Sequence, residues 1–173
     1  MSRIADCFQR LADNHQKALV VYVVAGDPSP AVTVPLMHDM VASGASIIEL
    51  GVPFTDPEAE GPVIQLAHER AMRHRVSLRD AIAMVASFRE QDTVTPVVLM
   101  GYINPIEAMG YEAFAALAAS AGVDGTILVN VPPEEGQVLD KALISQDLDP
   151  IYLLAPTTPE ARAKMVLERH GGF

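Results

Sequence analysis

The stretch that decides the fold of this chain reads Ile47-Ile48-Glu49-Leu50-Gly51-Val52-Pro53-Phe54-Thr55-Asp56-Pro57-Glu58-Ala59-Glu60-Gly61-Pro62. Glu49 interrupts an apolar strand, and no basic residue lies nearby in the sequence to neutralise it. Such a carboxylate either finds a partner from elsewhere or lies in a pocket that raises its pKa. A raised pKa suits a general acid, so the stretch predicts an active site at a strand end.

The same pattern, an apolar strand that ends in turn residues, recurs at 22–28, 99–105, 129–135 and 153–160. Strand, turn and helix alternate about every 25 to 45 residues, which is typical of a parallel α/β fold. For Glu49 alone, the alternative is a side chain that turns outward at the strand end and caps or pairs locally. The repeated pattern favours an active-site role for Glu49 over this alternative.

Composition narrows the class of protein. A chain of 173 residues with 50 % apolar residues is expected to form one domain with a substantial core. The net charge of −10 opposes nucleic acid or an anionic membrane as partner and favours a small molecule or a protein. A single cysteine, Cys7, excludes an internal disulfide, and residues 2–11 lack the apolar core of a signal peptide. We therefore expect a cytoplasmic protein.

Apolar periodicity and capping residues place the elements. The predicted strands cover residues 19–24, 47–50, 97–100, 125–129 and 151–154. The predicted helices cover 2–13, 30–43 and a segment through 111–117, and others begin at 62, 77, 133 and 158. Because neither face of the first strand is polar, we expect that strand to be central. A capping box at Ser77 and Asp80 supports the helix that begins there.

Five parallel strands with their turn residues at the strand ends favour a TIM-type barrel or an open doubly wound sheet. The first strand is not followed by Gly-x-Gly-x-x-Gly, and no P-loop sequence occurs, which removes the dinucleotide and P-loop interpretations. An eight-stranded barrel typically needs about 250 residues. We therefore expect one incomplete barrel domain over 1–173, with strands 1 to 5 and truncated before strand 6. Its inner face and its edge near Leu153 would be exposed, which favours self-association or a partner.

Four motifs together resemble the family of tryptophan synthase α subunits, and the resemblance runs from about Ile4 to Phe173. The motifs are Ala25-Gly26-Asp27-Pro28, residues 49–57, Gly61-Pro62-Val63-Ile64-Gln65 and Met100-Gly101-Tyr102-Ile103-Asn104-Pro105. The resemblance implies a TIM (β/α)8 barrel, a lyase that cleaves indole-3-glycerol phosphate to indole and glyceraldehyde 3-phosphate without a cofactor. It also implies an α2β2 complex, in which indole passes to a β subunit that depends on pyridoxal phosphate.

The resemblance also implies residue roles. Glu49 matches the general acid and base of the retro-aldol step. Glu60 falls where the family has an aspartate that stabilises positive charge at the indole N–H. Glutamate is one methylene longer, on the order of 1.5 Å, and a misplacement of about 1 Å can lower a rate about 100-fold. The alternative is that Glu60 is a solvated loop acid.

Further positions match the substrate pocket and the partner surface. The residues that match the indole pocket are Tyr22, Met100, Tyr102 and Ile127. Pro53, Phe54 and Asp56 match the loop that closes over substrate and contacts the β subunit. The five histidines, His15, His38, His68, His74 and His170, show no ligand spacing, so we assign none to a site and expect no metal.

Three departures leave a second interpretation open. The family usually has an apolar residue at Glu58, threonine at Val24 and aspartate at Asn130. The phosphate-binding loops after strands six to eight lie outside these residues. The second interpretation is a degenerate, non-catalytic α-like protein that keeps a β-subunit interaction surface. A third is another phosphate-handling barrel lyase on the same scaffold.

Overall fold

The computed structural model describes residues 2–168 and 171–173, and these form one parallel sheet with helices on its two faces. The strands are β1 (Val20–Val24), β2 (Ile47–Gly51), β3 (Val97–Gly101), β4 (Gly125–Leu128) and β5 (Asp149–Ile151). The helices are α1 (Arg3–Asp13), α2 (Pro30–Ala42), α3 (Pro62–Arg73), α4 (Leu78–Arg89), α5 (Ile103–Met109), α6 (Tyr111–Ala121), α7 (Gln137–Ile144) and α8 (Glu160–Leu167). His170 lies outside the described residues.

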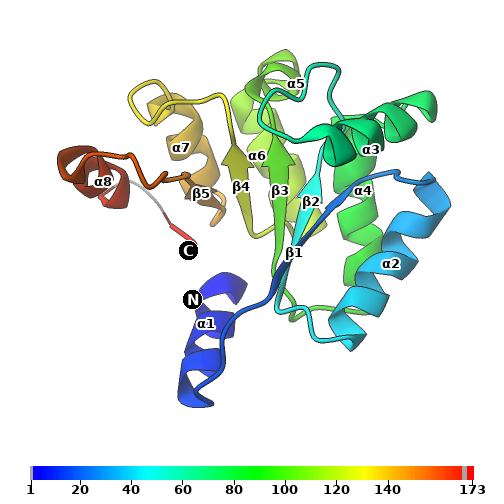
Figure 1. Cartoon of the computed structure of the whole chain (residues 1–173), viewed down its shortest axis with the longest axis horizontal. Helices are drawn as coiled ribbons and strands as arrows, with labels where there is room; N and C mark the ends of the chain where they lie inside the picture. The colour runs from blue at the N-terminus through cyan, green and yellow to red at the C-terminus, as the bar shows by residue number, and fades with distance from the viewer. Residues whose placement is uncertain (1, 169–170) are drawn as a thin grey trace.

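The strands lie side by side in chain order, β1-β2-β3-β4-β5, and every neighbouring pair is parallel (Figure 1). A doubly wound sheet would reverse its strand order at a switch point, and this sheet does not. The order is that of a barrel wall, so the barrel interpretation is confirmed over the open sheet. Figure 1 shows α2 beside β1 and α8 beyond β5, at opposite ends of the wall.

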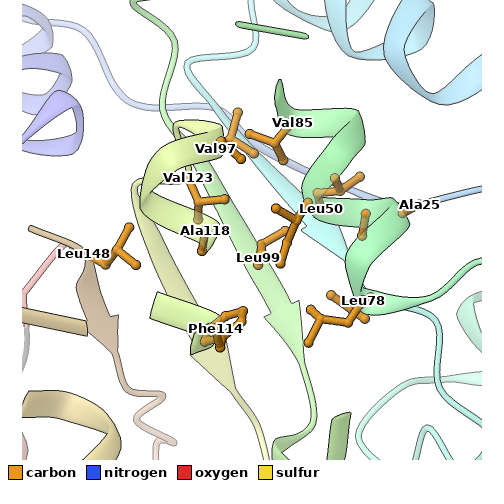
Figure 2. Close-up of a cluster of buried hydrophobic side chains, with 14 of the residues drawn as sticks. Ala25, Leu50, Leu78, Val85, Val97, Leu99, Phe114, Ala118, Val123 and Leu148 are labelled. Carbon is orange, nitrogen blue, oxygen red and sulfur yellow. The ribbon is translucent and has the colours of Figure 1, made fainter. Parts of the chain in front are cut away.

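The main core lies between the outer face of the sheet and helices α2, α4, α6 and α7. Ile48 and Leu50 of β2 and Leu99 of β3 are at most 2 % exposed on this face. Figure 2 shows Leu50 and Leu99 together with Leu78 and Val85 of α4 and Phe114 of α6. Because side chains alternate along a strand, Ile47, Glu49 and Val98 point to the opposite, inner face.

Helix α1 covers the lower part of that inner face. Ile4 and Cys7 of α1 pack with Ile47, Val98, Ile127 and Ile151, and all six are buried. Phe8 contacts Phe173, with ring centroids 5.7 Å apart, so the chain ends lie near each other. The expectation of an exposed inner face is therefore wrong for its lower part, and the open part is the upper end near Tyr22, Glu49 and Met100.

Four local predictions differ from the structure. β1 pairs only with β2 and is an edge strand, since no second neighbour lies beside it among the described residues. Helix α5 was not predicted, because the segment after β3 was read as a turn. Residues 132–136 form hydrogen-bonded turns, so α7 begins at Gln137 and not at Pro133. β5 ends at Ile151, and Leu153 beyond it is exposed.

None of the helices in the described part of the chain is long and apolar enough to cross a membrane. The single cysteine, Cys7, is free and buried against Ser46 O, with Sγ 3.4 Å from that oxygen.

Candidate active site

Four of the predicted site residues lie on the inner face of the sheet, between the middle of their strands and the carboxyl end. Register pairs Tyr22 of β1 with Glu49 of β2, and Met100 of β3 with Ile127 of β4. Tyr22, Glu49 and Met100 are half-buried, whereas Ile127 is buried and belongs to the cluster beneath α1. The first three residues therefore lie on the part of the inner face that α1 leaves open, whereas Ile127 is covered by α1.

Glu49 is a half-buried carboxylate without a local partner. No hydrogen bond or ion pair joins its side chain to another residue of the described chain. Burial raises the pKa of Glu49 above its ordinary value, because leaving water disfavours the charged form. A carboxyl group held in this state can donate a proton near neutral pH more readily than a solvated one.

Glu60 approaches the same place from the loop after β2. Its side chain is only 7 % exposed. The Tyr102 hydroxyl donates to Glu60 Oε2 at 2.6 Å, and His68 Nε2 lies 3.8 Å from Glu60 Oε1. The interpretation of Glu60 as a solvated loop acid is therefore wrong, because the loop folds the carboxylate inward against β3 and α3.

Tyr102 joins the end of β3 to this loop. Its hydroxyl accepts from Ala59 N–H at 3.0 Å while it donates to Glu60. Its ring stacks on Phe54, with centroids 4.6 Å apart and planes 17° from parallel. Burial, and next the hydrogen bond to Glu60, raise the pKa of Tyr102 to about 12, so the hydroxyl stays protonated at neutral pH.

The hydroxyl of Tyr22 occupies space that a glycine leaves open. A Cβ built on Gly51 would overlap the Tyr22 hydroxyl and ring. Burial, and next the charge of Glu60, raise the pKa of Tyr22, and Glu49 adds to the shift. Both carboxylates therefore lie close enough to the Tyr22 hydroxyl to disfavour its ionisation.

His68 is the residue that sequence reasoning missed. It lies on α3 with 2 % exposure, contacts Tyr22 through Nε2 at 3.2 Å and accepts from Phe54 N–H at Nδ1 at 3.1 Å. Burial lowers the pKa of His68, although the charge of Glu60 opposes that shift. The available signal was its place four residues after Ile64, on the helix face that packs on β1.

The loop that matches a partner contact lies beside an open hollow of about 550 Å³. Phe54 and Asp56 line this hollow together with Glu58 and Glu69. Of the predicted contact set, Pro53 is buried, Phe54 is half-buried and Asp56 is exposed. The hollow is acidic, which favours a basic surface on any partner.

The departures at Val24 and Asn130 have local structural roles. Val24 is 3 % exposed and packs against Ala67 and Ala71 of α3. Asn130 Oδ1 accepts from Ile103 N–H at 2.9 Å and so binds the first residue of α5. Glu58 is exposed. No group of three or more His, Cys, Asp or Glu within 2–168 and 171–173 is placed to hold a metal ion.

Parallel strands in barrel order, with acids and tyrosines on or just after them, define the fold class of this chain as that of the (β/α)8 barrel. Comparison with known protein families then identifies the family of this chain. The family model described as tryptophan synthase alpha chain matches residues 8–173, and the chain belongs to this family.

Individual relatives agree with that assignment. The tryptophan synthase alpha chain of Thioalkalivibrio sulfidiphilus is 64 % identical over 173 residues, which are 100 % of this chain and 65 % of the relative. The alpha chain of Marinobacter nauticus is 56 % identical over 100 % of this chain and 64 % of the relative. The chain thus spans less than two thirds of these curated relatives.

Solved structures share the fold. The tryptophan synthase subunit alpha of Legionella pneumophila superposes with a TM-score of 0.97 at 49 % identity, over 99 % of this chain and 66 % of that chain. A chain of the tryptophan synthase α2β2 complex of Pyrococcus furiosus superposes with a TM-score of 0.84 at 36 % identity, over 88 % of this chain and 64 % of that one. The sheet and helices of this chain therefore superpose on about two thirds of each of these solved chains.

Proposed function

We propose that this chain carries the acid–base part of a lyase site that cleaves indole-3-glycerol phosphate to indole and glyceraldehyde 3-phosphate. The observation that carries the proposal is the half-buried Glu49 in the middle of β2, without a hydrogen-bond or ion-pair partner in the described chain and beside Tyr22, whose pKa is raised by the charges of both Glu60 and Glu49. Family membership supplies the substrate. In this proposal residues 1–173 belong to one barrel domain.

In the proposed reaction, protonated Glu49 donates its proton to indole C3 and so forms an indolenine with a positively charged ring nitrogen. The Glu49 carboxylate then takes the proton of the side-chain hydroxyl next to C3. As the carbon–carbon bond breaks, the hydroxyl carbon becomes the aldehyde, and the bonding electrons return to the ring to restore indole. Glu49 ends protonated, as it began.

Glu60 is proposed to stabilise the positive charge at the ring nitrogen. Its Oε2 is engaged by Tyr102 at 2.6 Å, whereas the contact of Oε1 with His68 Nε2, at 3.8 Å, is longer than a hydrogen bond. Oε1 can therefore accept a hydrogen bond from the indole N–H. A charge-assisted bond of this kind strengthens as the nitrogen becomes positive, which is the requirement for transition-state stabilisation.

We propose that the phosphate is held by segments that correspond to the remaining third of the relatives, because barrels of this class commonly bind phosphate after strands seven and eight. The proposed partner is a tryptophan synthase β subunit in an α2β2 complex, docked at the loop that carries Asp56. The lyase step needs no cofactor, and pyridoxal phosphate is expected only in the β subunit.

The proposed location is the cytoplasm, because the free thiol of Cys7 fits a reducing compartment.

A second candidate function is a non-catalytic module that keeps only the β-subunit surface. The observation that favours it is the set of departures from the family residues at Glu58, Glu60 and Asn130. Glu60 is the decisive position, because its longer side chain is already retracted onto Tyr102.

The test uses this chain joined to the final third of the Thioalkalivibrio sulfidiphilus relative, which completes the barrel. Indole release from indole-3-glycerol phosphate is followed with and without an added β subunit. The lyase proposal expects release that the β subunit accelerates. A folded protein that binds the β subunit but releases no indole would establish the second candidate instead.

A further inference from the structure

His68 joins three parts of the site that are separate in sequence. From α3 it reaches the backbone of the loop at Phe54, the Tyr22 hydroxyl on β1, and Glu60 at the end of the loop. Only 2 % of the residue is exposed. A buried polar side chain with this many partners restricts the arrangement of its surroundings.

The hydrogen bonds assign the tautomer of His68. Phe54 N–H donates to Nδ1 at 3.1 Å, so Nδ1 carries no proton. The neutral ring must then carry its proton on Nε2, which donates to the Tyr22 oxygen at 3.2 Å. Since Tyr22 accepts from His68, its own proton is free to be donated to a different acceptor.

We propose that His68 is a positioning residue, which as the Nε2–H tautomer directs the Tyr22 hydroxyl toward the substrate and ties the order of the 54–60 loop to the site. The inference rests on the proposed lyase function for its consequence in catalysis. The tautomer and the hydrogen bonds of His68 do not depend on that function. We do not propose that His68 itself contacts the substrate.

Protonation of His68 would break this arrangement. An imidazolium carries a proton on Nδ1, which would face Phe54 N–H, so the loop would lose its tether. The groups in contact with His68 are Tyr22 from β1 and Glu60 from the loop, and Tyr102, just after β3, lies beyond Glu60. Asp56, Glu58 and Glu69 line the same hollow as His68. Burial disfavours the charged form of His68, and the charge of Glu60 favours it. The Phe54 N–H donor at Nδ1 adds to burial and favours the neutral ring.

The first test is a long-range proton–nitrogen NMR spectrum of the His68 ring in the 173-residue protein, recorded from pH 5 to pH 8. The expected result is an unprotonated Nδ1 and a protonated Nε2 that persist below the ordinary histidine pKa of 6.5. The opposite tautomer, or titration of His68 at or above that value, would overturn the proposal. This readout needs no catalysis, so it is independent of the lyase proposal.

Two variants then separate the two bonds of His68. His68→Asn keeps an acceptor near the Nδ1 position and loses the donor to Tyr22, whereas His68→Gln keeps a donor near Nε2 and loses the acceptor for Phe54. We expect the Tyr22 ring signals to shift only in His68→Asn, and the Phe54 amide signal only in His68→Gln. Identical shifts in both variants would overturn the proposal.

In the completed barrel, His68→Asn is expected to lower kcat about tenfold with KM changed less than about twofold, because an oriented donor is lost. His68→Gln should retain more activity than His68→Asn at neutral pH. A completed barrel that cleaves substrate equally well with either variant would overturn the positioning role. If wild type and variants all lack activity, the lyase proposal fails, and the NMR result still decides the geometry.

Discussion

The Tyr102 hydroxyl donates to Glu60 Oε2 at 2.6 Å and at the same time accepts from Ala59 N–H at 3.0 Å. One hydroxyl therefore fixes both the backbone and the carboxylate of the loop after β2. The loop is held over the strand ends by the side chain of the residue that follows β3, and this explains why Glu60 is buried although it lies in a Pro- and Gly-rich segment.

Tyr102→Phe is predicted to destabilise the protein by about 1–3 kcal/mol, because Ala59 N–H and a buried carboxylate oxygen lose their partner. The stacking on Phe54 is kept, since phenylalanine has the same ring. Urea unfolding measures the change. Tyr111→Phe is the matched control: its hydroxyl donates to exposed Glu107, and a loss within about 0.5 kcal/mol is expected. Equal losses in the two variants would contradict the role of Tyr102.

Glu49→Gln is predicted to stabilise the protein at neutral pH. Burial raises the folded pKa of Glu49 above its ordinary value of 4.5, so between these two values the folded state binds more protons than the unfolded state. Stability contributed by protonated Glu49 is thus present below 4.5 and is lost as the pH rises through the folded pKa. Glutamine does not ionise, so the Glu49→Gln variant does not lose this stability.

Thermal unfolding at pH 4 and pH 7 checks the prediction for Glu49→Gln. The gain in Tm should be larger at pH 7 than at pH 4. Glu90→Gln, at an exposed position, is the control and should change the free energy of unfolding by less than about 0.5 kcal/mol at both pH values. A gain for Glu49→Gln that is larger at pH 4 would show that the charge of Glu49 is not the cause.

Gly51→Ala is predicted to cost about 1–3 kcal/mol, because its Cβ would overlap the Tyr22 hydroxyl and ring. In a Tyr22→Ala background the overlap is absent, and the same substitution should be nearly neutral. A double-mutant cycle from urea unfolding gives the coupling. If Gly51→Ala costs the same in both backgrounds, the glycine is required for a reason other than Tyr22.

Arg89→Met is predicted to cost about 1–3 kcal/mol, because the Asp124 carboxylate, 3 % exposed, loses one of its two cations in the described chain and keeps only Arg3 at 2.9 Å. Arg89 also donates to the carbonyls of Gly122 and Thr95, which lose their partner. Arg162→Met breaks the exposed ion pair with Glu134 and should cost at most about 1 kcal/mol. Chemical denaturation of both variants tests the ranking.

The sequence predicted most of the wall, because local signals decide where its elements begin. Ser77 and Asp80 form the expected capping box, and Pro30 and Pro62 begin helices as predicted. The position of β1 at the edge of the sheet could not be predicted, since a strand with two apolar faces can be either a central or an edge strand. Pro133 lies in a turn instead of opening α7, because proline suits both places equally.

For the site, one acid in an apolar strand pointed to Glu49, and the structure shows it half-buried in β2; its catalytic role stays a prediction. The burial of Glu60 could not be read from the sequence, because it depends on Tyr102, 42 residues away. His68 escaped notice for the same reason. Its partners come from β1 and from the loop, and helical periodicity identifies a face of α3 without naming what lies opposite.

The central claim is that Glu49 transfers the protons of carbon–carbon cleavage, and single-turnover indole formation tests it most directly. The completed barrel and its Glu49→Gln variant are compared with saturating indole-3-glycerol phosphate at pH 7. The account predicts a rate at least about 100-fold lower for Glu49→Gln, the size expected for loss of a general acid and base. A Glu49→Gln rate within about twofold of wild type would contradict it.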